Sequence, residues 1–416
     1  MPNLDPFFIE WTTRGPGQSR SLSRAAMLLR ALDLEREHVP VLGVVGSKGK
    51  GTAATFAAAT LAAAGLRTVL VTGPSFRSYR ERVRVDGMSV TDTELHLLGE
   101  VLETSRRTLP TVEGSGGYLA PSGLFLIAGL LHARSIGADV CVLEAGMGGH
   151  RDELRLVGPE VVALGPVFGE HLGVLGRTVP EIAREKTLVA GKRTRALVSL
   201  PQKAQVTTVV AQTLAEATGG RVSPEVVDPD VEGTEPPVWS RPKGLSAASG
   251  VLGTAAATRM LKTLGQPRPA PERLRSVLAG VRLPARLSRH PVPGTSTEVV
   301  VDSAIDRVGI TAALTHVRGL WPGVDHVLLC LPDHKDVSGA VASLEGIPVT
   351  MVRLPETHLR FAYDLPEHWG HTDADGLSPA SVTALGRRVL ALGTVYFTGR
   401  MLELLDAPTD RLFDPS

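Results

Sequence analysis

The fold class is decided by the stretch VLGVVGSKGKGTAATFAAATLAAAG, residues 41–65. A β-branched apolar run leads into the turn GSKGKGT, which opens a long alanine-rich segment. A strand that ends in a glycine-rich turn and continues as a helix presents several backbone N–H groups to an anion, with the helix dipole behind them. A plain strand-to-helix turn would need glycine, but it would not need two lysines. The pattern therefore predicts a phosphate-binding loop made of Gly46, Ser47, Lys48, Gly49, Lys50, Gly51 and Thr52.

Two residues of this loop have side chains suited to a nucleotide. Lys50 would place a point charge on the outer phosphates, and the Thr52 hydroxyl would hold Mg²⁺. The loop differs from the common pattern GxxxxGK[ST], because Val44 stands where that pattern has its first glycine and Gly51 separates the lysine from the threonine. We expect phosphate binding in spite of these two differences.

Composition narrows the class of protein. At 416 residues the chain is too long for one ordinary domain, and its net charge of +1 gives no broad basic surface for nucleic acid or membranes. The cysteines Cys141 and Cys330 lie in apolar runs, so we expect buried side chains and no disulfide. The N-terminus lacks a signal-peptide pattern, and no apolar run reaches the roughly 20 residues that span a bilayer. We expect a cytoplasmic, monomeric protein without nucleic-acid or membrane partners.

Short apolar runs alternate with helix-patterned segments, which predicts a parallel α/β sheet. The strands predicted in the first series are 39–46, 67–73, 138–146, 160–168 and 195–200. The helices predicted between and after them are 52–64, 122–136, 179–189 and 252–264. From 201 to 243 the pattern weakens, and its Pro- and Gly-rich part fits a short strand hairpin or a loop equally well.

A second α/β series follows a proline-rich boundary. Its predicted strands are 297–303, 324–332, 347–355 and 393–399. We therefore predict a P-loop parallel-sheet ATP-binding domain over residues 1–285 and a smaller, Rossmann-like α/β domain over residues 286–416. Ligands of two such domains usually lie in the cleft between them.

Motifs along the whole chain resemble those of one family, in the same order. GSKGKGT resembles the GTNGKGS/T loop of the folylpolyglutamate synthase and dihydrofolate synthase family, within the Mur ligase superfamily. The further matching segments are PSFRSYRERVRVDGMSVTDTEL (74–95), LEAGMGGHRDEL (143–154), GEHLGVLGRTVPEIAREKTLVAG (169–191), LPARL (283–287), DHKDV (333–337) and TVYFTGRMLELLD (394–406). One motif alone would be weak, but the ordered set identifies the chain as a divergent member of this family.

The resemblance implies roles for individual residues. Glu144 and His171 would bind metal, and Lys186 would carry a carbamate that binds a second magnesium ion. Arg286 would reach the phosphates from the domain boundary. Without the resemblance, these residues would fit a buried carboxylate, a structural histidine and solvated charges. The predicted site has Lys50, Lys186 and His171 as catalytic residues, the loop residues with Arg286 and Asp302 as nucleotide-binding residues, and Thr52, Glu144, His171 and Lys186 as metal ligands.

The implied reaction is a ligation in two steps. A substrate carboxylate attacks the γ-phosphate of ATP, and an amine then attacks the acyl phosphate, which gives an amide, ADP and phosphate. The implied cofactors are ATP and Mg²⁺, with two ions expected. The implied partners are a small-molecule carboxylate and an amine.

Departures from the family lie where groups other than phosphate would bind. DGAHNP is replaced by DSAIDR (302–307), GxHQxxNA by ASGVLGTA (248–255), and TxFE by APSG (120–123). LDATN keeps its aspartate as Asp152 but loses the Ala-Thr-Asn that follows. Each lost polar contact would cost on the order of 1–3 kcal/mol of recognition.

These departures leave three hypotheses open. The first, which the sequence favours, is an ATP-dependent amide ligase with a specialised, non-folate substrate. The second is a folylpolyglutamate or dihydrofolate synthase that adds glutamate to folates. The third is a catalytically weak nucleotide-binding subunit that supports a partner enzyme. Fold alone does not choose between them.

Overall fold

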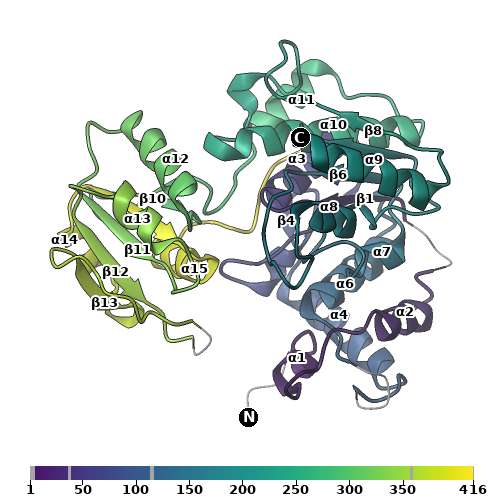
Figure 1. Ribbon diagram of the computed structural model, residues 1–416, viewed down its shortest axis with the longest axis horizontal. Helices are drawn as coiled ribbons and strands as arrows, with labels where there is room; N and C mark the ends of the chain where they lie inside the picture. The colour runs from purple at the N-terminus through teal and green to yellow at the C-terminus, as the bar shows by residue number, and fades with distance from the viewer. Residues whose placement is uncertain (1–4, 36–38, 113–116, 357–358, 416) are drawn as a thin grey trace.

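The strands pair into two separate sheets, and each sheet organises one domain (Figure 1). The computed structural model describes residues 5–35, 39–112, 117–356 and 359–415. The first sheet has the order β4-β3-β2-β5-β1-β6-β7-β8, and only its β2–β3 and β3–β4 pairs are antiparallel. Its strands are β1 Val41–Val45, β2 Thr68–Val71, β3 Val83–Val85, β4 Met88–Ser89, β5 Val140–Glu144, β6 Val161–Leu164, β7 Ala196–Ser199 and β8 Pro224–Val226.

Both faces of this sheet are covered by helices, because its central strands β5, β1 and β6 are apolar at every position except Glu144 at the end of β5. In β1, Val41 and Val45 belong to the core on one face, and Leu42 and Val44 belong to the core on the other. The first face is covered by α2 Leu22–Ala31, α4 Asp92–Arg106, α6 Pro121–Ser135, α8 Val179–Thr187 and α9 Ala204–Thr218. The second face is covered by α3 Lys50–Ala63, α10 Ala247–Thr263 and α11 Pro271–Ala279.

Helix α3 is buried almost all round, which explains its alanines. Small side chains let α10 pack close against it. A Cβ added at Gly253 of α10 would lie only 2.1 Å from the carbonyl oxygen of Ala53 in α3. This close packing fixes the start of α3, and the start of α3 carries the glycine- and lysine-rich loop.

The second domain has the strand order β13-β12-β11-β14-β10-β9, with β9 as the antiparallel edge. Its strands are β9 Ser288–Pro291, β10 Glu298–Asp302, β11 His326–Cys330, β12 Val349–Arg353, β13 Gly370–Asp373 and β14 Arg388–Gly393. Helices α12 Arg307–Arg318 and α13 Val337–Ser343 cover one face. Helices α14 Pro379–Ala384 and α15 Val395–Leu404 cover the other.

The predicted strand at 393–399 is wrong. The strand β14 ends at Gly393, and the next residues begin α15. Thr394 caps this helix, since its Oγ1 accepts a hydrogen bond from the Phe397 N–H at 3.4 Å. The aromatic and β-branched residues that resembled a strand instead pack one helix face into the core, with Phe397 and Met401 fully buried.

The end of the chain crosses back from the second domain to the first, as the yellow trace in Figure 1 shows. The Ser89 N–H donates to the Asp410 carbonyl at 2.8 Å, and the Leu412 N–H donates to the Gly87 carbonyl at 2.9 Å. Leu412 and Phe413 are buried in the core of the first domain. The two domains are therefore joined at two places, near residue 286 and near residue 407.

Two smaller features complete the fold. Between β8 and α10 the chain runs as a loop with two short 3-10 turns, Val238–Ser240 and Gly244–Ser246. The short helices α1 Ile9–Thr13 and α7 Leu154–Val157 lie in the first domain. None of the helices in the described ranges has the length and apolar character needed to cross a membrane.

Candidate active site

The loop between β1 and α3 needs glycine at two points. Gly46 has a φ of +146°, and a Cβ there would lie 2.9 Å from the Cα of Gly165. Gly49, with a φ of +77°, is the N-cap of α3. A Cβ at Gly49 would lie 2.1 Å from Ser249 Oγ. The first backbone N–H groups of α3 have no partners within the helix, so the start of α3 is where an anion would bind.

Two lysines meet the carbonyl of Gly46. Lys50 Nζ donates to this oxygen at 3.1 Å, and Lys186 Nζ donates to it at 3.0 Å. The Lys186 side chain is only 1% exposed and pairs with Glu170 Oε1 at 2.7 Å. Burial lowers the pKa of Lys186, and Glu170 opposes that shift. Lys186 therefore supports the loop from behind, held between the Gly46 carbonyl and Glu170.

Glu144 ends β5 beside the loop. Its Oε2 accepts a hydrogen bond from the Gly73 N–H at 3.0 Å. Desolvation raises the pKa of Glu144, and the nearby Lys50 charge opposes that rise. Thr52 lies in the first turn of α3, and its side chain lines the same cavity as Glu144. A carboxylate and a hydroxyl are the hard oxygen donors that Mg²⁺ prefers, so this pair fits a magnesium ion.

Arg286 lies in the link between the domains, between two residues with left-handed backbone. Ala285 has a φ of +51° and Leu287 a φ of +53°, conformations that cost non-glycine residues about 1–3 kcal/mol each. The Leu287 N–H donates to Asp302 Oδ2 at 2.8 Å, which ties the link to the end of β10. Burial raises the pKa of Asp302, and the Arg286 charge opposes that rise.

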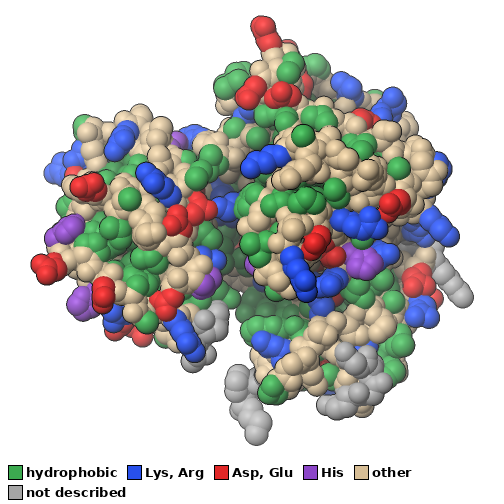
Figure 2. All heavy atoms as spheres, viewed as in Figure 1, with side chains coloured by type: hydrophobic (Ala, Val, Ile, Leu, Met, Phe, Trp, Pro, Cys, Tyr) green, Lys and Arg blue, Asp and Glu red, His purple; other side chains and the backbone are tan. Residues whose placement is uncertain are grey.

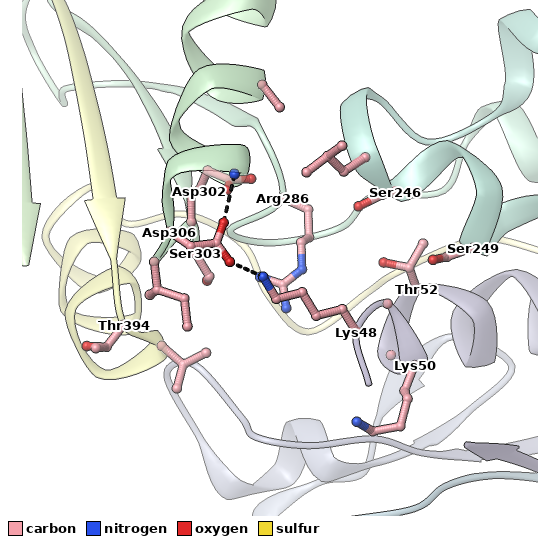
Figure 3. Close-up of a pocket in the computed structure, with 18 of the residues that line it drawn as sticks. Lys48, Lys50, Thr52, Ser246, Ser249, Arg286, Asp302, Ser303, Asp306 and Thr394 are labelled. Carbon is pink, nitrogen blue, oxygen red and sulfur yellow. Dashed lines mark hydrogen bonds and ion pairs between the residues drawn. The ribbon is translucent and has the colours of Figure 1, made fainter. Parts of the chain in front are cut away.

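A cavity of about 560 Å³ lies between the two domains. Figure 2 shows the hollow between them, and Figure 3 shows Arg286 between the loop and the end of β10. This size is within the usual range for small-molecule sites. Of the predicted site, the residues that line it are Ser47, Lys48, Gly49, Lys50, Gly51, Thr52, Glu144, Arg286 and Asp302.

The other predicted residues lie outside the lining. Gly46 and Lys186 are behind the loop, in contact through the hydrogen bond described above. His171 is exposed, with a φ of +46°, on the loop that follows β6. In the described ranges, no three His, Cys, Asp or Glu side chains form a metal-binding cluster. The four-residue metal set therefore stays a prediction, as does a carbamate on Lys186.

Sequence reasoning missed an ion pair that crosses the cavity. Lys48 Nζ pairs with Asp306 Oδ2, and Figure 3 shows the two side chains meeting between the domains. Asp306 also caps α12, since its Oδ1 accepts a hydrogen bond from the Gly309 N–H at 2.8 Å. Both residues stand where the family motifs have asparagine. The sequence did contain a sign of this pair: Lys48 and Asp306 each replace an asparagine of the family motifs, and their charges have opposite sign.

Comparisons with known proteins agree with this architecture. No family profile matches the chain. A probable bifunctional folylpolyglutamate synthase/dihydropteroate synthase of Halobacterium salinarum is 34% identical over 186 residues, which are 44% of this chain and 22% of that protein. A dihydrofolate synthase/folylpolyglutamate synthase of Escherichia coli is 25% identical over 410 residues, 93% of this chain and 91% of that protein. The chain is similar to proteins of this synthase family along nearly its whole length.

The coverage of the relatives differs widely. In five curated relatives of this chain, the segment that matches it spans between 19% and 39% of the relative's own length. Among solved structures, Mycobacterium tuberculosis folylpolyglutamate synthase complexed with ADP superposes with a TM-score of 0.78 at 19% identity, over 97% of this chain and 99% of that one. At this identity the superposition shows the shared two-domain fold.

Proposed function

We propose that the chain is an ATP-dependent ligase that activates a carboxylate as an acyl phosphate and joins it to an amine. The observation that carries this proposal is a cavity lined by groups from both domains. Lys50 and Glu144 approach it from the first domain, and Arg286 and Asp302 approach it from the link and the second domain. The ADP named with the Mycobacterium tuberculosis structure supports a nucleotide in the corresponding place.

The loop and the two cations would carry out the first step. The loop amides and Lys50 hold the outer phosphates while the substrate carboxylate oxygen attacks the γ-phosphorus and ADP leaves. Arg286 adds positive charge from the opposite wall. These groups act by position and charge rather than by covalent chemistry, so closure of the domains around the nucleotide should control the rate.

Thr52 and Glu144 would hold Mg²⁺ in this site. The ion supplies charge neutralisation for the triphosphate when it is bound. His171 and a carbamylated Lys186 remain our candidates for a second ion. In the second step the amine nitrogen attacks the acyl carbon and loses a proton to the solvent, the bond from that carbon to the phosphate oxygen breaks, and inorganic phosphate leaves.

A folate-type acid with glutamate as the amine is the first substrate pair to test, because the relatives named above carry that activity in their names. One structural observation weakens the argument that the acid end has diverged. Gly123 stands at the position of the glutamate in the family's TxFE segment, yet a Cβ there would lie 2.2 Å from Glu153 Cδ. Glu153 therefore places a carboxylate in the space that a glutamate at position 123 would fill.

A different acid is the second candidate. It is favoured by the residue at position 122, a serine that lies beside Gly146. Ser122 is small where the family's TxFE segment has phenylalanine, so the wall of the acid end has lost an aromatic ring. A loss of that ring would change which acid packs there.

The experiment is a phosphate-release assay with Mg·ATP, glutamate and either dihydropteroate or tetrahydrofolate, with mass spectrometry of the product. We expect ADP, phosphate and a product heavier by one glutamyl residue. Lys50→Ala should abolish release, whereas the exposed, distant Lys192→Ala should not. Release with other carboxylates only would favour the second candidate. Nucleotide binding without release from any acid would favour a supporting subunit.

A further inference from the structure

The cavity has two ends beyond the phosphate loop, and they differ in chemistry. One end lies beside Glu144 and Gly73 and includes Tyr396. Gly73 places this end next to the outer phosphates, because its N–H bonds to Glu144. The other end lies between the turn Gly244–Ser246 and helix α12, as Figure 3 shows for Ser246 and the helix that Asp306 begins.

The base of a nucleotide lies at the far end from its outer phosphates. With the outer phosphates beside Lys50 and Glu144, the nucleotide extends past Ser249, which touches the loop at Gly49. The base would then reach the space between Leu245 and α12. The walls of this space are apolar: Leu245 on one side, and Ile305, Ala312 and Ala313 on the other.

Leu245 forms an exposed part of the cavity wall. Its side chain is 62% exposed although it lines the cavity. Its apolar surface is therefore open to contact with a ligand in the cavity. Ile305 is held more firmly, because it packs against the buried core of the second domain.

Polar groups at this end are few and unselective. Among the described residues lining the cavity there is no asparagine or glutamine. Lys243 supplies one ammonium and Ser246 one hydroxyl. The Lys243 ammonium lies close enough to α12 to add to the desolvation that lowers the pKa of His316. A hydroxyl both donates and accepts by rotation, and an ammonium donates to any acceptor. The hydroxyl can therefore pair with the amino group of adenine or with the carbonyl of guanine, and the ammonium can pair with the guanine carbonyl but not with the adenine amino group.

We propose that this end is an apolar clamp that contacts both faces of a purine and does not select adenine at its edge, so that the chain accepts GTP as well as ATP. The inference rests on the proposed function, because it takes the nucleotide site from it. Apolar pockets discriminate only weakly between ligands of similar shape, whereas sites with matched hydrogen bonds reach far higher ratios. The ammonium of Lys243 further offsets any preference for adenine, because it can donate to the guanine carbonyl.

Calorimetric titration with the magnesium complexes of AMPPCP and GMPPCP tests this clamp. We expect the two dissociation constants to agree within about tenfold. Leu245→Ala and Ile305→Ala should each weaken both analogues by a similar factor of about three to ten, because each removes apolar contact area from the base. The control is Leu97→Ala, since Leu97 is 53% exposed on α4 and lies outside the cavity lining.

Each result has one meaning. A preference for AMPPCP of more than tenfold would overturn the clamp and leave the proposed ligase intact. Unchanged affinities in Leu245→Ala, or a loss confined to one analogue, would also overturn it. Failure of both analogues to bind the folded wild-type chain would overturn the proposed function together with the clamp.

Discussion

Lys48 and Asp306 form an ion pair that joins the phosphate loop of the first domain to the start of α12 in the second. The Lys48 side chain is 53% exposed and that of Asp306 is 30% exposed. Lys335 also faces this pair, and its charge acts on both partners. The loop lysine is thus held by a carboxylate at the place where a triphosphate would arrive.

Replacing the two partners should change nucleotide affinity in opposite directions. Lys48→Met removes a cation near the phosphates, so Mg·AMPPCP should bind several-fold more weakly. Asp306→Asn removes a competing anion and still caps α12, because asparagine is a good N-cap, so binding should tighten. Unfolding free energy should change by less than about 1 kcal/mol in each, since the pair is half-exposed. Calorimetric titration measures the affinities, and a similar loss in both variants would contradict this account.

Glu144→Gln should remove activity without lowering the stability of the free protein. Desolvation raises the pKa of Glu144, so the folded state binds a proton more readily than the unfolded state. The ionised carboxylate therefore costs stability above that pKa, and lowering the pH relieves the cost. We expect the variant without ligand to be at least as stable as wild type at pH 8 in urea unfolding, and to lose its Mg²⁺-dependent phosphate release. A variant that is both unstable and active would refute the assigned role.

A buried ion pair near the N-terminus should dominate acid sensitivity. Glu10 accepts hydrogen bonds from Arg24 Nη2 at 2.9 Å and from the Leu119 N–H at 2.8 Å. Burial alone would raise the pKa of Glu10, but these partners outweigh it and leave the pKa lowered. The resulting stability is present above the ordinary carboxyl pKa and is lost as the pH falls through the lowered value.

Glu10→Gln should cost about 3 kcal/mol of unfolding free energy near neutral pH, because Arg24 would remain buried without its charge partner. Urea unfolding at pH 7 and pH 4 measures the effect, and the difference from wild type should shrink at the lower pH. Glu103→Gln serves as the control, because that carboxylate is 20% exposed and should matter much less. An equal effect of the two variants would show that burial of the pair is not decisive.

Gly253→Ala tests the close contact between α3 and α10. The new methyl group would meet the Ala53 carbonyl at 2.1 Å, so overpacking should cost about 1–3 kcal/mol even though alanine favours helix. Gly99→Ala in α4 is the matched helical control, since its nearest neighbour would be a proline side-chain atom at 3.3 Å. Thermal unfolding should show a lower midpoint for Gly253→Ala only. Equal midpoints would mean that α10 can move away from α3 at little cost.

The features that the sequence could predict are those determined by residues close together in the chain. The loop at 46–52 depends on glycines whose backbone geometry is set by adjacent residues, and the apolar strands of both sheets carry their own signal. The run at 393–399 misled for the same reason: its β-branched and aromatic residues resemble a strand until the Thr394 cap is seen. Period and composition alone cannot separate a short buried helix from a strand.

Contacts between distant residues explain the rest. The return of residues 407–415 to the first domain, the Lys48–Asp306 pair and the place of Glu153 beside Gly123 all join positions that are far apart or in different motifs. Two of the departures from the family motifs are therefore compensated nearby. Asp306 pairs with Lys48, and Glu153 lies where a glutamate at position 123 would lie. A comparison of motifs considers each position separately, so it does not detect that a change at one position is compensated by a residue in another motif.

The central claim is that the loop at 46–52 binds the triphosphate of a nucleotide, and calorimetric titration of Mg·AMPPCP into wild type and Lys50→Ala tests it most directly. The account predicts saturable binding to wild type with a stoichiometry near one, and a loss of at least about tenfold in Lys50→Ala, with the thermal midpoint of the free variant unchanged. Equal binding by both proteins, or none by the folded wild type, would contradict it.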